Sequence, residues 1–130
     1  MNTEDSMSVV MDSSAWIEFF LGGPARKHFR EFILNPEDLI VPSITIYEVY
    51  KKFLTLYDET AAVNVISHMQ KGRVVELTEY MAIWAAKLSK DLQLPMADSI
   101  ILATAYATNS MVWTLDKDFK GIEGVNYCGA

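Results

Sequence analysis

Short apolar runs alternate with longer amphipathic stretches along this chain, and no other feature of the sequence constrains the fold as strongly. The apolar runs predict buried strands at residues 8–11, 39–41, 73–77, 111–114 and 125–128. Between them, apolar residues recur at intervals of three and four, which predicts helices at 15–21, 25–34, 45–57, 59–70, after Thr78, and at 96–108. Strands that alternate with helices indicate an α/β fold with a mostly parallel sheet of four to five strands.

The length of 130 residues fits a single domain over 1–130, with residues 1–7 expected to be a loose N-terminal tail. The one cysteine, Cys128, forms neither an internal disulfide nor a Cys-based zinc site. The N-terminal segment lacks the basic and apolar regions of a signal peptide, and no apolar run reaches the roughly 18 residues that span a bilayer. We therefore expect a cytoplasmic protein that does not engage a membrane.

Four acidic residues occupy positions different from those of the other acids, which lie mostly on polar helix faces. Asp12 directly follows the first strand, and Asp116 comes two residues after the fourth. Glu48 and Asp98 lie in the first turns of two helices. Strand carboxyl ends and helix N-termini share one edge of a parallel sheet, where ligands bind. The four carboxylates are therefore predicted to meet there.

A pocket of four carboxylates must bind protons, basic partners or a cation. Two unit charges about 5 Å apart repel by roughly 3 kcal/mol at an effective dielectric near 20. Oxygen ligands without His or Cys suit Mg²⁺ or Mn²⁺, which serve phosphate chemistry. The net charge of −6 argues against nucleic acid unless divalent cations neutralise such a cluster.

Each acid also has a structural interpretation, and these alternatives stay open at this point. Asp12 could cap the first helix, although Ser13 and Ser14 are good caps too. Thr45 and Glu48 form a T-x-x-E capping box. Asp98 could complement a helix dipole, and Asp116 and Asp118 could be turn residues.

At these acids the chain resembles PIN-domain ribonucleases, in particular VapC-type toxins of toxin–antitoxin pairs. Four segments carry the resemblance in order: VMDSSAW at 10–16, SITIYEV at 43–49, LPMADSIILATA at 94–105 and TLDKDF at 114–119. The third is the closest match, and the resemblance spans nearly the whole chain. It implies a PIN-like three-layer α/β/α fold.

The resemblance also implies an activity and a site. Asp12, Glu48, Asp98 and Asp116 would be catalytic and would bind Mg²⁺ or Mn²⁺, with Asp118 as an additional candidate ligand and Ser14 and Thr114 as supporting polar groups. The expected activity is cleavage of RNA phosphodiesters by a metal-activated water, in a homodimer inhibited by a cognate antitoxin protein.

Lys51 and Lys52, just past Glu48, are candidates for RNA contact, although lysines on a helix are more often only solvated. Three rival interpretations remain. The chain could be a catalytically silent PIN-like module that binds protein or RNA, or a PIN nuclease of RNA processing. It could also be another Mg²⁺-binding α/β domain such as a phosphoacceptor receiver, although receivers need paired acids after the first strand.

Overall fold

A computed structural model describes residues 7–129, so most of the predicted N-terminal tail lies outside the described residues. The strands are β1 (Ser8–Met11), β2 (Leu39–Pro42), β3 (Arg73–Val75), β4 (Ser110–Thr114) and β5 (Val125–Tyr127). The α-helices are α1 (Ser13–Leu21), α2 (Arg30–Leu34), α3 (Ser43–Leu56), α4 (Glu59–Met69), α5 (Glu79–Leu92) and α6 (Met96–Ala107). Short 3₁₀ turns are η2 (Pro24–His28), η3 (Pro36–Asp38) and η4 (Lys117–Phe119). Within residues 7–129, no helix combines the length and apolar character needed to cross a membrane.

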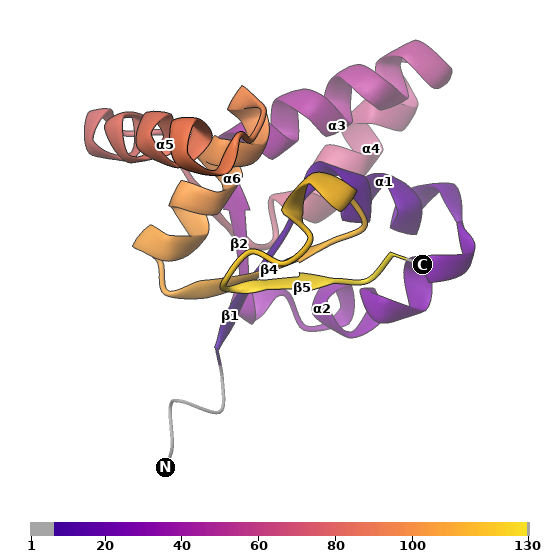
Figure 1. The fold of residues 1–130 in the computed structure, drawn as a ribbon. Helices are drawn as coiled ribbons and strands as arrows, with labels where there is room; N and C mark the ends of the chain where they lie inside the picture. Colours follow the sequence, from indigo (N-terminus) through magenta and orange to yellow (C-terminus); the bar gives the residue numbers. More distant parts are fainter. Residues whose placement is uncertain (1–6, 130) are drawn as a thin grey trace.

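The strands form one five-stranded sheet in the order β3–β2–β1–β4–β5, and every neighbouring pair is parallel (Figure 1). Val10 of β1 pairs with Ile40 of β2 on one side and with Val112 of β4 on the other. The predicted α/β fold with a parallel sheet is confirmed. Since all strands run the same way, their carboxyl ends share one edge, which brings the residues after β1 and β4 together.

Helices cover both faces of this sheet, and the alternation of side chains along each strand divides the core in two (Figure 1). Val9 and Met11 pack with residues of α1, α3 and α4. Val10 packs on the opposite face with Ile101 and Leu102 of α6. Strands buried on both faces need apolar residues at successive positions, which is why the runs were recognisable in the sequence.

The predicted helix at 25–34 is wrong as a single element. A 3₁₀ turn over Pro24–His28 and the short helix α2 replace it, with Phe29 between them. The Arg26 guanidinium donates hydrogen bonds to the carbonyls of Gly22 and Gly23, which fixes the 3₁₀ turn against the end of α1. Phe29 is fully buried, so its side chain sets where the chain changes direction.

Replacing Ile101 by alanine is expected to lower the free energy of unfolding by about 2–5 kcal/mol, because the lost side chain leaves a cavity between α6 and the sheet. Ile101 has 0% exposure, whereas Ile83 on the neighbouring α5 is 54% exposed. Ile83→Ala is therefore the matched control and should change stability by less than about 1 kcal/mol. Urea unfolding followed by circular dichroism measures both. Equal effects would contradict the described core.

Candidate metal centre

Asp12 lies at the junction of β1 and α1, and both of its carboxylate oxygens accept hydrogen bonds. Oδ1 accepts from the backbone N–H of Ala15 at 3.1 Å and from the Ser14 hydroxyl at 2.7 Å. Oδ2 accepts from the Thr114 hydroxyl at 2.6 Å. Asp12 is thus the N-cap of α1, and the prediction that Ser13 or Ser14 caps this helix is wrong. The capping interpretation is correct for Asp12, and it also fixes the carboxylate at the edge of the sheet.

Ser14 and Thr114 connect this carboxylate to the chain that follows β4. The Ser14 hydroxyl oxygen accepts a hydrogen bond from the N–H of Leu115 at 3.1 Å. The Thr114 hydroxyl oxygen accepts one from the N–H of Asp116 at 2.8 Å. The segment that carries Asp116 is therefore positioned through the same two hydroxyl groups that bind Asp12.

Glu48 does not form the capping box that its sequence context allowed. Helix α3 begins at Ser43, two residues before Thr45, and has no side-chain cap. In a capping box the Thr45 hydroxyl would accept a hydrogen bond from the backbone N–H of Glu48. Instead, the buried hydroxyl donates to the carbonyl of Pro42 at 2.6 Å. The Glu48 carboxylate accepts a hydrogen bond from the Ser13 hydroxyl, which directs it towards the start of α1.

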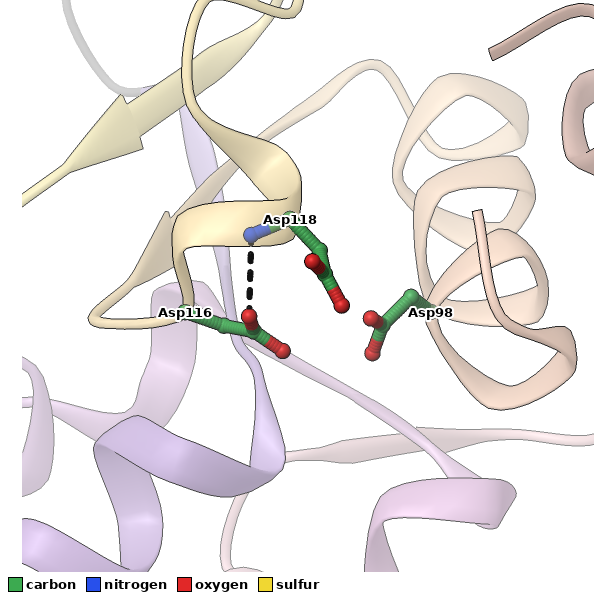
Figure 2. A group of neighbouring side chains, drawn as sticks. All are labelled: Asp98, Asp116 and Asp118. Carbon is green, nitrogen blue, oxygen red and sulfur yellow. Dashed lines mark hydrogen bonds between the residues drawn. The ribbon is translucent and has the colours of Figure 1, made fainter. Parts of the chain in front are cut away.

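Asp98, Asp116 and Asp118 form the tightest group of acids. Each offers a carboxylate oxygen, and the three oxygens lie within 4.8 Å of one another (Figure 2). Asp98 comes from the first turn of α6, whereas Asp116 and Asp118 flank the start of η4. Asp116 also accepts a hydrogen bond from the N–H of Asp118 at 2.9 Å (Figure 2), so its interpretation as a turn residue is correct as well.

The electrostatics show that these acids share one environment. The pKa of the Asp98 carboxyl is raised to about 7, first by burial and then by the negative charges of four neighbours: Asp116, Asp12, Glu48 and Asp118. The pKa of Asp12 is raised to about 6, mainly by burial, although its hydrogen bonds to Thr114, Ser14 and Ala15 oppose the shift. The fold thus brings the other three predicted site acids, and Asp118, within electrostatic reach of Asp98.

The donor set of this cluster fits a hard divalent cation. The three closest ligand atoms are carboxylate oxygens, which Mg²⁺ and Mn²⁺ prefer. A cation there would offset the repulsion that, after burial, helps to raise the pKa of Asp98. The closest group includes Asp118, which the sequence had placed second to the other four acids, while Asp12 and Glu48 adjoin it. The part played by Ser13 was missed, because its partner Glu48 is distant in sequence.

Lys51 and Lys52 lie exposed on α3, in the helical turn after Glu48. Together with Glu48 they line a surface pocket of about 300 Å³. The structure therefore places both lysines beside Glu48.

A family model of the PIN domain matches residues 9–125. The chain belongs to the PIN domain family, as its sequence motifs predicted. No curated protein matched the chain in the corresponding comparison.

Solved structures share the fold over nearly their whole length. A toxin–antitoxin complex from Klebsiella pneumoniae is 24% identical with a TM-score of 0.80, covering 93% of this chain and 98% of that one. DNA-bound VapBC from Salmonella typhimurium is 16% identical with a TM-score of 0.74, covering 94% and 98%. VapC20 from Mycobacterium tuberculosis, a sarcin–ricin loop cleaving toxin, is 15% identical with a TM-score of 0.72, covering 91% and 97%. These likenesses show that the fold is PIN-like.

Neutralising one acid is expected to stabilise the metal-free protein at neutral pH. Folding raises the pKa of Asp98 from its ordinary 3.8 to about 7, so the protonated carboxyl favours the folded state. This contribution to stability is fully present below pH 3.8 and is lost as the pH rises through about 7. Asp98→Asn removes this loss, so the melting temperature at pH 7.5 should rise by about 2–6 °C in a chelator. At pH 5 the difference should shrink, because Asp98 is then largely protonated.

Glu37→Gln is the matched control for this experiment. Glu37 is an exposed acid before β2, at the opposite end of the sheet, and its neutralisation should leave the melting temperature nearly unchanged. An Asp98→Asn protein that melts below the wild type at pH 7.5 would contradict the repulsive cluster.

Proposed function

We propose that this PIN-domain protein is a metal-dependent endoribonuclease and the toxin of a type II toxin–antitoxin pair, acting in the cytoplasm. The observation that carries the proposal is the convergence of Asp98, Asp116 and Asp118 within 4.8 Å in a chain of the PIN domain family. The structural likeness to the Klebsiella toxin–antitoxin complex and to VapBC supports the toxin role.

In this proposal Asp98, Asp116 and Asp118 hold Mg²⁺ or Mn²⁺, with Asp12 and Glu48 completing the negative pocket. When bound, such a cation supplies an acidified water and offsets the charge that develops on a phosphodiester. The chain's own contribution is positioning. Ser14 and Thr114 orient Asp12 and the segment of Asp116, and the Ser13 hydroxyl orients Glu48.

The toxin role requires a protein partner, and we propose a cognate antitoxin encoded in a neighbouring reading frame, together with a homodimer of this chain. The expected partner is a short protein with a DNA-binding head and a flexible tail. Co-purified partner that suppresses RNA cleavage would support the toxin role. Full cleavage in the presence of that partner would favour a PIN nuclease of RNA processing. Light scattering tests the dimer.

The metal should bind more weakly as the pH is lowered, because protons and the cation compete for the same carboxylates. Calorimetric titration with Mn²⁺ should show saturable binding at pH 7.5. The affinity should fall as the pH passes below about 7 and then about 6, the raised pKa values of Asp98 and Asp12. Glu37→Gln should bind as the wild type does. Absence of saturable binding at pH 7.5 would favour a silent module.

Asp98→Asn should abolish RNA cleavage while leaving the fold intact, since it removes one ligand charge without changing the size of the side chain. The measurement is cleavage of total RNA by purified protein in Mg²⁺ or Mn²⁺, with circular dichroism to confirm folding. The loss should be at least about 100-fold, the scale expected when a group that stabilises charge is removed. Glu37→Gln should keep wild-type activity. An Asp98→Asn protein with full activity would refute the proposed function.

A further inference from the structure

One side of α3 carries aromatic and basic residues that begin beside the candidate metal centre. Tyr47, Lys51 and Thr55 follow one another at intervals of four residues, so they lie along one face of the helix. Lys52 follows Glu48 at the same interval in the neighbouring row. We call Tyr47, Lys51, Lys52 and Thr55 the α3 strip. With Glu48, these residues line the surface pocket of about 300 Å³.

Tyr47 is an aromatic side chain that the core does not use. It is 60% exposed, and the Lys51 ammonium nitrogen lies 5.9 Å from the centroid of its ring. An exposed aromatic ring next to a cation is the combination that proteins use to bind unpaired nucleotides, because the ring stacks on a base and the cation binds the backbone. Thr55 lines the same pocket, and its hydroxyl donates to the Lys51 carbonyl at 2.8 Å within the helix.

The charge distribution around the site favours a polyanion at this strip. The chain has 11 basic residues against 17 acidic ones, and the acidic cluster by itself repels phosphate. Lys51 and Lys52 are exposed and lie one helical turn beyond Glu48. An RNA strand that reaches the cluster from this side therefore meets two positive charges immediately before it reaches the acids.

We propose that the α3 strip binds an unpaired nucleotide of the RNA substrate, with its base stacked on Tyr47 and the adjoining phosphates bound by Lys51 and Lys52. The inference rests on the proposed nuclease function, because the pocket that the strip lines is also lined by Glu48 of the candidate metal centre. A base can stack on Tyr47 only after leaving a helix. The preferred substrate is therefore a single strand or a loop, and not a continuous duplex.

The test measures binding of a fluorescein-labelled uridine 20-mer by anisotropy, in the Asp98→Asn protein with Mg²⁺, so that the readout does not depend on cleavage. Adding Lys51→Gln and Lys52→Gln should reduce the slope of log affinity against log salt by about 1.4, the value for two phosphate contacts on a single strand. Adding Tyr47→Leu should weaken binding on the order of tenfold. It should also remove the preference for the single strand over a duplex of equal length.

Helix α5 offers matched controls of the same chemistry, beside a surface pocket whose lining includes none of the five site acids. Tyr80 is 69% exposed and lines a different pocket together with Lys87. Tyr80→Leu, and separately the pair Lys87→Gln and Lys90→Gln, should leave the affinity and the salt slope unchanged. If the α5 variants lost as much RNA affinity and salt slope as the α3 variants, binding would not be specific to the α3 strip. That result would overturn the proposal.

The outcomes separate this inference from the proposed function. If the wild type cleaves RNA but the α3 variants bind with wild-type affinity and slope, the strip proposal fails and the nuclease assignment stands. If the wild type cleaves no RNA but the α3 variants lose binding as described, the strip stands and the nuclease assignment fails. A third outcome is that the α3 variants bind RNA as the wild type does but lose binding of the proposed antitoxin. That result would assign the strip to the antitoxin and overturn the proposal.

Discussion

The hydrogen bonds around the Asp12 carboxylate are the interaction on which the candidate site depends. Asp12 begins α1 by accepting from the N–H of Ala15, and it joins β1 to the end of β4 by accepting from Thr114. The residue is only 2% exposed, so these donors replace the water that its carboxylate would otherwise bind. Fixing Asp12 therefore fixes the loop that carries Asp116 and Asp118, which ties the geometry of the cluster to the central strands of the sheet.

The same arrangement stores electrostatic repulsion in the folded state. Burial and neighbouring charges raise the pKa of Asp98 to about 7. At neutral pH, the metal-free fold therefore holds carboxylates close together although they repel one another. A domain of this size has a large core on both faces of its sheet, which can offset such a local cost. This is the balance expected of a site that is preorganised for a cation, because a bound cation would relieve the repulsion among the carboxylates.

The sequence allowed the sheet and the location of the acids to be predicted, because strands buried on both faces are continuously apolar and their carboxyl ends share an edge. Features that depend on tertiary contacts could not be predicted from local sequence patterns. The chain breaks at Phe29 because that side chain is buried, and the local pattern alone favoured one helix. Thr45 and Glu48 matched a capping box, yet α3 begins two residues earlier. The bond from Ser13 to Glu48 joins distant segments and had no local signal.

Net charge is a poor guide to the ligand of a protein built in this way. A value of −6 suggests that a polyanion would be repelled, but the potential at a site depends on how charges are distributed around it. Here several acids converge on one edge, where a bound divalent cation would offset part of the negative charge, and Lys51 and Lys52 lie one turn after Glu48 on α3. The proposed nuclease function needs both signs of charge within a short distance, because cations bind the phosphates of RNA and acids hold the metal. Helix α3 meets this requirement with Glu48 at one position and Lys51 and Lys52 one turn later.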